Sequence, residues 1–175
     1  MDYLIAALAD PRLRLFAASS LGEIRAHAAV PALVRNLNVK NDPVRNAAVK
    51  ALGRIGDPSA IPSLVDVACT DEAAGVRTTA IDALATLGAP EGVQLMARLA
   101  LEPAAVLAGT TRFFEGPVVR WIRRSHLRFV QTWAARRLRQ LHLVEALPLL
   151  EPLPSSLRLL QRLRLRRTIR VLRAR

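Results

Sequence analysis

The residues in this sequence best suited to chemistry are arginines, and the chemistry they suit is anion binding, because a guanidinium donates a fixed fork of hydrogen bonds to phosphate or carboxylate. Arg120, Arg124 and Arg128 recur at four-residue spacing, and on a helix Arg136 and Arg139 fall on the same side. The stripe predicts one of two things. It is either a solvated outer helix face or a surface that contacts phosphates or acidic side chains.

A second arginine stripe lies at the C-terminus, where the last twenty residues contain eight arginines and no acid. Its members at helical spacing are Arg158, Arg162, Arg166, Arg170 and Arg173. Like charges four residues apart repel one another and weaken an isolated helix, and an anionic partner would relieve that repulsion. Three partners fit this stripe: a nucleic-acid backbone, an anionic membrane surface or an acidic protein.

Two further sets of charged residues recur at intervals of 31 and 32 residues. The first set is Arg14, Arg45 and Arg77, and the second is Arg35, Asp66 and Arg98. The first set is expected either to pair with acids and backbone carbonyls and so hold neighbouring segments together, or to present a row of charge to a partner. The second set is expected to form a structural ladder of alternating sign or to line a partner-binding groove, although exposed ion pairs contribute little stability.

Catalytic and metal-binding constellations are not recognisable. His27, His126 and His142 lie far apart and lack a metal-ligand spacing. Cys69 has no neighbouring histidine in sequence and is expected to be a buried or semi-buried thiol. The acids after residue 100 are Glu102, Glu115, Glu145 and Glu151. We therefore expect a protein that is not an enzyme, holds no metal and needs no cofactor.

The elements that carry these residues differ in charge along the chain. The 175 residues have a net charge of +12. Residues 1–100 contain ten basic and ten acidic residues, so their net charge is zero. Residues 101–175 contain sixteen arginines and four glutamates, so they carry the whole excess of +12. Positive charge confined to one end of the chain favours an anionic partner at that end.

An internal repeat organises the first hundred residues. Matched positions recur at the same intervals of 31 and 32 residues. The matched columns include Ala17, Ala48 and Ala80; Leu21, Leu52 and Leu84; Ile24, Ile55 and Leu87; and Val30, Ile61 and Val93. Apolar residues within each unit are spaced by three and four, which predicts helices with one buried face. One helix pair cannot bury that face alone, so the units must stack.

The ends of these helices have recognisable signals. Asp42 and Asp57 each precede a proline and are expected to be helix N-caps, and Asp10 precedes Pro11 in the same way. Gly53 and Gly56 are expected to bracket the turn between the two helices of the middle unit.

The stretch VRNAAVKALGRIGDPSAIPSL (residues 44–64) resembles the HEAT-like repeat family, particularly the short repeats found in phycobilisome lyases and bacterial scaffold proteins. Weaker copies lie on either side, and Met1–Ala9 resembles the second helix of an incomplete unit. The resemblance implies an all-α, right-handed α-solenoid of stacked helix pairs whose second helices line a concave surface. It implies binding or scaffolding and carries over no catalytic residue.

The predicted organisation has four parts. Regular HEAT-like repeats cover residues 1–100, and an irregular insertion covers 101–116. Residues 117–151 form a long basic helix and a degenerate fourth repeat, in which Ala134, Leu138 and Leu147 align with Ala48, Leu52 and Ile61. Residues 152–175 form an Arg-rich helix, or a tail that becomes ordered on binding.

These features lead to a functional hypothesis with two alternatives. The first is a scaffold or adaptor without catalytic activity, which binds a protein partner through the repeats and an anionic partner through its Arg-rich end. The alternatives are a nucleic-acid-binding HEAT-like protein and, from the family resemblance, an accessory subunit of a partner enzyme similar to a bilin lyase. No apolar stretch is long enough to span a membrane and no signal peptide is recognisable. We expect a cytoplasmic location, with peripheral attachment to an anionic surface as a further option.

Overall fold

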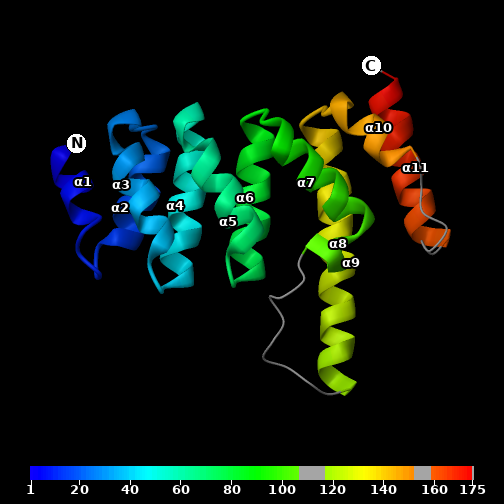
Figure 1. Cartoon of the computed structure of the whole chain (residues 1–175), viewed down its shortest axis with the longest axis horizontal. Helices are drawn as coiled ribbons and strands as arrows, with labels where there is room; N and C mark the ends of the chain where they lie inside the picture. Colours follow the sequence, from blue (N-terminus) through cyan, green and yellow to red (C-terminus); the bar gives the residue numbers. More distant parts are fainter. Residues whose placement is uncertain (107–116, 152–158, 175) are drawn as a thin grey trace. The chain divides into compact units, whose positions relative to one another are not determined.

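The computed structural model describes residues 1–106, 117–151 and 159–174. Within these ranges, only the backbone is described for residues 117–126, 159–161 and 164. Helices make up all the regular secondary structure of this described part (Figure 1). They form successive HEAT-like helix pairs, so the prediction of an all-α solenoid of repeats is confirmed.

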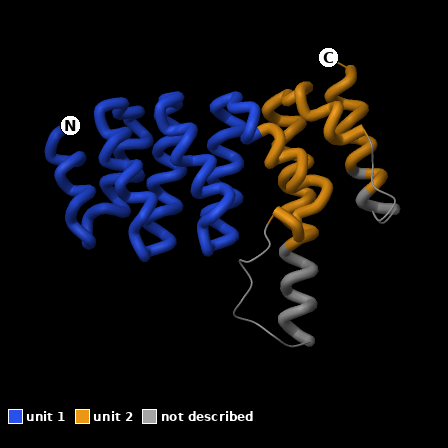
Figure 2. Tube along the Cα trace, in the orientation of Figure 1, with its two compact units in different colours: residues 1–92 blue, residues 93–175 orange. Residues whose placement is uncertain are grey.

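The chain divides into two compact units, residues 1–92 and residues 93–175 (Figure 2). The division falls inside one helix, whereas the repeat pattern extends to residue 100. The C-terminal turn of that helix belongs to the second unit, where its carbonyls accept hydrogen bonds from Gln131.

Unit 1 is a stack of helix pairs. Its elements are α1 (Asp2–Ala7), α2 (Arg14–Glu23), the 3-10 turn η1 (His27–Ala29), α3 (Val30–Arg35), η2 (Asn36–Asn38), α4 (Asp42–Ile55), η3 (Pro58–Ala60), α5 (Ile61–Thr70), α6 (Ala74–Thr86) and the start of α7 (Pro90–Leu101). The first helices of successive pairs, α2, α4 and α6, pack directly against one another (Figure 1).

The matched sequence columns form the core of this stack. Leu21, Leu52 and Leu84 occupy one column and each is 0% exposed. Ala48 and Ala80 in the neighbouring column are also 0% exposed. A buried leucine contributes about 1.5–3 kcal/mol through removal of its surface from water. The residues that recur in the sequence repeat are therefore the ones that form the buried core.

Close approach between the first helices depends on small residues. A methyl group added to Gly22 would lie 2.7 Å from the Cα of Ala51, and one added to Gly53 would lie 2.8 Å from the Cβ of Ala83. Gly53 lies inside α4, so the prediction that it brackets the turn is wrong. Its role is to let α6 approach α4, and only Gly56 occupies the turn.

The turn between the two helices has the same backbone conformation in every unit. The residues with positive φ are Arg25 (50°), Gly56 (81°), Gly88 (71°) and His142 (55°). Each follows the buried leucine of its unit by four residues. The left-handed conformation at this position lets the next amide bond back to the helix, as in a Schellman motif. The amides of Ala26, Ala89 and Leu143 donate in this way to the carbonyls of Leu21, Leu84 and Leu138, at 3.0, 3.0 and 3.1 Å.

Unit 2 contains the rest of α7, α8 (Pro103–Val106), α9 (Pro117–Gln140), η4 (Val144–Ala146), α10 (Leu147–Leu150) and α11 (Leu159–Arg173). The last turns of α9, followed by η4 and α10, repeat the pattern of the earlier units, including the left-handed residue at His142. A short helix, α8, lies within the range expected to be irregular, and residues 107–116 of that range lie outside the described residues.

The C-terminal arginine-rich segment forms the helix α11, which packs against α9 and α10. Leu165, Ile169 and Leu172 turn inward and are buried. Leu138 of α9 and Leu150 of α10 are 0% exposed in the same unit. Residues 159–173 of the segment predicted as a helix or tail are helical, and residues 152–158 lie outside the described residues.

Candidate functional site

The arginines at the start of the first helices hold the stack together. Arg45 and Arg77 are 5% and 8% exposed. Arg77 Nε donates to the Ala68 carbonyl at 3.2 Å, and Arg14 Nη2 donates to the Ala9 carbonyl at 3.0 Å. The interpretation that these residues bond to acids and backbone carbonyls is confirmed. Arg45 and Arg77 are buried, so these two are not presented to a partner.

Arg45 connects α4 to two other segments. Its Nε and Nη2 donate to the two carboxylate oxygens of Asp71 at 2.7 and 2.9 Å, and its Nη1 donates to the Val39 carbonyl at 2.9 Å. The hydrogen bond to Asp71 raises the pKa of Arg45 and outweighs the opposing effect of burial. One side chain thus ties α4 to the segments that precede it and to the loop before α6.

The helix-capping residues differ in part from the prediction. The N-cap of α4 is Asn41, whose side chain accepts from the Val44 amide at 3.3 Å. Asp42 lies one residue later and pairs with Arg45 at 2.9 Å, so its expected role as N-cap is wrong. Asp57 caps η3 as predicted, and accepts from the Ser59 amide at 2.9 Å.

Asp57 also links two neighbouring units. Its Oδ2 lies 3.2 Å from Nδ1 of His27, which is exposed as expected for a turn position. Hydrogen bonds from Ser59, with a further contribution from His27, lower the pKa of Asp57.

The charged ladder predicted on the second helices is exposed but not paired. Arg35 on α3 and Asp66 on α5 make no ion pair with each other in the described part of unit 1. Asp66 instead accepts from the Thr70 hydroxyl at 3.5 Å. Arg98 is exposed on the unit 2 part of α7. Arg35 lines a groove of about 410 Å³ together with Arg14 and side chains of α1. A partner-binding role for these three residues stays a prediction.

The arginine stripe on α9 separates into two kinds of residue. Arg128 and Arg136 are exposed. Arg139 is half-buried, and its Nη1 donates to the Thr168 hydroxyl of α11 at 2.8 Å. Burial, followed by the like charges of Arg167 and Arg136, lowers the pKa of Arg139. The side chains of Arg120 and Arg124 lie outside the described residues.

The arginines of α11 separate in the same way. Arg166 and Arg170 are exposed, and Arg162 is half-buried. Arg173 donates from Nε and Nη2 to Glu151 Oε1 at 3.1 and 2.9 Å, so it is engaged within the unit. Arg158 lies outside the described residues.

Three residues of this unit were not recognised from the sequence. Arg167 lies on the outer side of α11, and Phe129 of α9 is 68% exposed. Gln131 is buried and donates to the Ala100 and Leu101 carbonyls at 2.8 and 3.2 Å, which caps the end of α7. Positioning Arg167 opposite Leu165, Ile169 and Leu172 on a helical wheel would have found the first of these.

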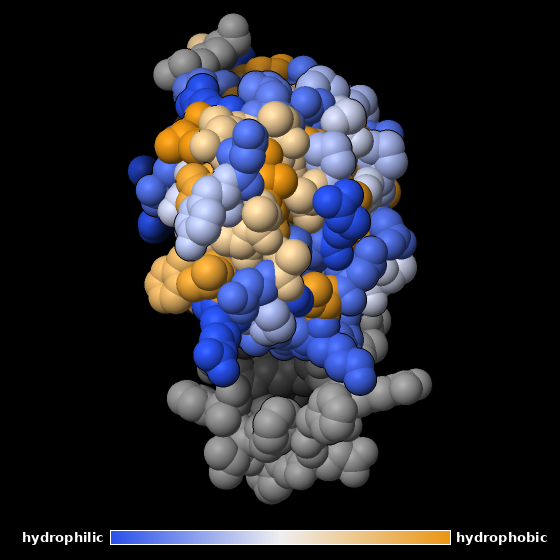
Figure 3. Space-filling model, turned by 90° about the vertical axis from the view of Figure 1, so that its left-hand side faces the viewer, coloured by the Kyte–Doolittle hydropathy of each residue, from blue (hydrophilic) through white to orange (hydrophobic). Residues whose placement is uncertain are grey.

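The N-terminal end of unit 1, formed by α1 and the neighbouring α2, carries large exposed apolar residues. Tyr3 is 77% exposed, Phe16 is 70% exposed and Met1 is 59% exposed. Figure 3 shows apolar side chains gathered over the middle of this end of unit 1, with hydrophilic side chains around them. Large exposed apolar residues that lie together are typical of protein interaction surfaces.

The remaining candidates are few. Cys69 is exposed, so its expected burial is wrong. Among residues 1–106, 117–151 and 159–174, no group of histidine, cysteine and acidic residues has the arrangement of a metal site. A search of the same residues finds no helix that could cross a bilayer.

Comparison with known proteins agrees with the repeat architecture. Residues 1–85 match the family model for HEAT repeats, so this part of the chain is a HEAT-repeat array. The predicted resemblance to such repeats is confirmed. The chain is also similar to the bilin biosynthesis protein PecE of Mastigocladus laminosus, with 34% identity over 104 residues. The match covers 54% of this chain and 39% of that protein, so it spans well under half the length of the relative.

Proposed function

We propose that this chain is an accessory subunit that binds a partner polypeptide and supports that partner's reaction on a bilin, without contributing a catalytic group of its own. The observation that carries the proposal is the similarity to a bilin biosynthesis protein over 104 residues. This range is longer than the HEAT-repeat match and exceeds half of the chain.

The surface of unit 1 supports this role. HEAT-type stacks bind partners through the faces that successive helices present. The exposed Tyr3 and Phe16 supply large apolar contact area, and aromatic anchors of this kind commonly dominate the energy of protein interfaces. The buried Arg45–Asp71 pair links α4 to the loop before α6 and keeps this part of the stack in register.

The test has two measurements. The full chain is tagged in its native host and isolated, and the isolated complex and the chain alone are each mixed with a linear tetrapyrrole such as biliverdin. We expect a second polypeptide to copurify, and we expect the absorption spectrum of the tetrapyrrole to change only with the complex. A chain that elutes alone, or that changes the spectrum without a partner, would contradict the proposal.

A matched pair of variants locates the contact. Tyr3→Ser combined with Phe16→Ser is expected to reduce recovery of the partner. Val144→Ser combined with Leu149→Ser, which alters two exposed apolar residues of unit 2, is expected to leave it unchanged. Equal recovery with both double variants would remove this surface from the proposal.

A second candidate function is an adaptor that connects a protein partner to an anionic one. The exposed arginines of α9 and α11 favour this reading, because they form a cationic surface separate from the repeats of unit 1. The two functions are compatible, since an accessory subunit can also position its partner.

A further inference from the structure

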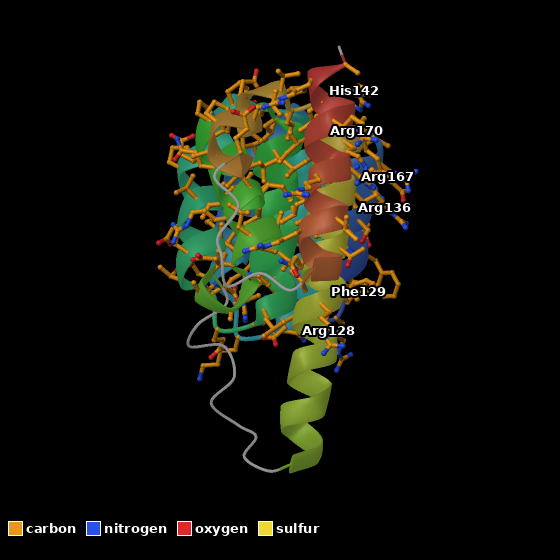
Figure 4. The ribbon with its side chains drawn as sticks, turned by 90° about the vertical axis from the view of Figure 1, so that its right-hand side faces the viewer. Arg128, Phe129, Arg136, His142, Arg167 and Arg170 are labelled. Atoms are coloured by element: carbon orange, nitrogen blue, oxygen red, sulfur yellow. The ribbon has the colours of Figure 1, made fainter. Side chains whose placement is uncertain are left out.

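Two helices of unit 2 build a surface on which exposed arginines gather. We call it the α9–α11 face. It consists of Arg128, Phe129 and Arg136 on α9 and of Leu163, Arg166, Arg167, Arg170 and Val171 on α11. Figure 4 shows the labelled residues Arg128, Phe129, Arg136, Arg167 and Arg170 along the same side of this helix pair.

The face is held in place by the packing beneath it. Leu165, Ile169 and Leu172 attach α11 to the unit, and Arg139 joins α9 to Thr168 of α11 through a bond of 2.8 Å. Thr168 is 0% exposed. The arginines above are therefore arranged on a formed helix pair, and binding need not first order this segment.

The arginines of the face have no acidic partner among the described residues. Arg173, beyond its edge, is by contrast paired with Glu151. Unit 2 contains four glutamates and no aspartate, and none of the described glutamates pairs with Arg136, Arg167 or Arg170. Burial, followed by the like charges of Arg167 and Arg136, lowers the pKa of Arg139, and an anion on the face would relieve the second of these effects.

Apolar side chains project between these arginines. Phe129 is 68% exposed, Leu163 is 50% exposed and Val171 is 38% exposed. Phe129 follows Arg128 directly and precedes Arg136 by seven residues, about two helical turns. An anion that is purely polar would leave all three apolar residues without a partner.

This combination distinguishes the three classes of anionic partner. A nucleic-acid backbone uses the arginines but gives Leu163 and Val171 nothing to contact. An acidic protein surface would match the charge, because a positive patch meets a negative one, but it does not by itself account for the exposed Phe129, Leu163 and Val171. An anionic bilayer has negative headgroups above an apolar layer and requires no register, so it matches both the charge and the apolar residues.

We propose that the α9–α11 face binds peripherally to anionic phospholipid membranes, with its arginines on the headgroups and Phe129 inserted at the boundary between headgroups and acyl chains. The inference rests on the geometry of unit 2 and is independent of the proposed accessory function. It requires no membrane-spanning helix.

Vesicle sedimentation tests the proposal with the full chain. The probes are large unilamellar vesicles of phosphatidylcholine, with and without phosphatidylglycerol. We expect binding to the anionic vesicles at low salt to be at least about tenfold stronger than binding to the neutral ones, and to weaken as salt rises. Equal binding to both kinds of vesicle, or no binding to either, would overturn the proposal.

Two sets of charge reversals provide the matched control. Arg136→Glu, Arg167→Glu and Arg170→Glu together change the net charge by the same amount as Arg12→Glu, Lys40→Glu and Lys50→Glu, which alter exposed residues of unit 1. The first triple variant is expected to lose binding to anionic vesicles, and the second is expected to retain most of it. Equal losses would mean that net charge alone attracts the chain, and would overturn the assignment to this face.

Two further measurements complete the test. Phe129→Ser is expected to weaken binding to anionic vesicles most clearly at high salt, where the apolar contribution remains. Each variant is first checked by circular dichroism and thermal unfolding. If a variant of native stability binds anionic vesicles as the wild type does, the substituted residue has no role in binding. A duplex oligonucleotide that removes the chain from the vesicles at equal phosphate concentration would favour nucleic acid and contradict the proposal.

Discussion

Arg45 shows how a single charged residue can determine whether neighbouring repeats stay in register. Its side chain is 6% exposed and the Asp71 side chain is 5% exposed, so both charges have given up most of their hydration. A buried ion pair is not a large net source of stability compared with an apolar pair, but removing one partner leaves an uncompensated buried charge.

The first prediction follows from this asymmetry. Arg45→Met is expected to lower the free energy of unfolding by about 3 kcal/mol, measured by urea denaturation, because Asp71 loses its partner. The control is Arg54→Met, whose exposed partner Glu23 lies 3.7 Å away, and a change below about 1 kcal/mol is expected there. Adding Asp71→Asn to Arg45→Met should recover part of the loss. Equal stability of the Arg45→Met and Arg54→Met variants would contradict this account.

The left-handed turn residues carry a second prediction at the same scale. Arg25 adopts a φ of 50° at a position where two other units have glycine. Residues with a Cβ are strained in this conformation and glycine is not. Arg25→Gly is therefore expected to raise the free energy of unfolding by about 1 kcal/mol.

The reciprocal change provides the control for this prediction. Gly56→Ala is expected to lower the free energy of unfolding by a similar amount, although open space surrounds the added methyl group. Because nothing would clash with that methyl group, the loss would come from the backbone alone. Thermal unfolding of both variants and the wild type checks whether Arg25→Gly stabilises the protein and Gly56→Ala destabilises it. Destabilisation by both substitutions would show that the side chain of Arg25 matters more than its backbone.

At the scale of elements, the distance between successive first helices is set by glycine facing alanine. Gly22 faces Ala51, and one repeat later Gly53 faces Ala83. The intervals between these pairs are those of the sequence repeat, so the same contact is used twice. Small residues on both helices let the backbones approach and bury more of the flanking leucine column.

This contact gives the third prediction. Gly53→Ala is expected to destabilise the protein by about 1–3 kcal/mol, because the new methyl group would lie 2.8 Å from the Cβ of Ala83. Gly53→Ala combined with Ala83→Gly should be more stable than Gly53→Ala alone, since the pair is then reversed. Gly75→Ala, which meets nothing within 4 Å, is the control and should not be destabilising. Chemical denaturation of the four proteins measures each effect, and failure of the second substitution to help would exclude a steric cause.

The sequence was sufficient to predict the elements wherever the repeat is regular. The leucine column and the buried arginines could be predicted, because each unit repeats the same local signals and packs against its own copy. The capping residue Asn41 was missed because Asp42-Pro43 offers an equally good signal one residue later. The bond between Arg139 and Thr168 could not be predicted, because it joins residues 29 positions apart and α11 has no matching copy in the repeat.

At the scale of the whole molecule, charge and architecture divide the chain at similar places. Residues 1–100 are neutral and regular in sequence, and residues 101–175 carry the net charge of +12. The sequence showed that the excess is at one end, but it could not separate Arg173, which is paired with Glu151, from Arg170, which is exposed. That distinction depends on how α10 and α11 pack, and it determines which charges are available to a partner.

The last prediction tests whether α11 is a structural part of its unit. Buried Leu165, Ile169 and Leu172, together with the Arg139–Thr168 bond, make this helix part of the unit 2 core as well as a carrier of charge. Deleting residues 155–175 exposes the surface of α9 that it covers. Amides in residues 127–140 are therefore expected to exchange hydrogen much faster, whereas amides in α4 and α5 should keep their protection, since stability in stacked repeats depends mainly on nearest neighbours.

Hydrogen exchange followed by mass spectrometry makes this comparison, with Arg166→Gln plus Arg170→Gln in the full chain as the control. The control removes two exposed charges and leaves the buried face of α11 intact, so the protection of α9 should not change. If α9 stayed protected after the deletion, α11 would be an appendage that carries charge and supports nothing beneath it. If protection fell equally in α4 and α5, the two units would unfold together, and the loss of membrane binding in charge-reversal variants would need to be judged against global stability.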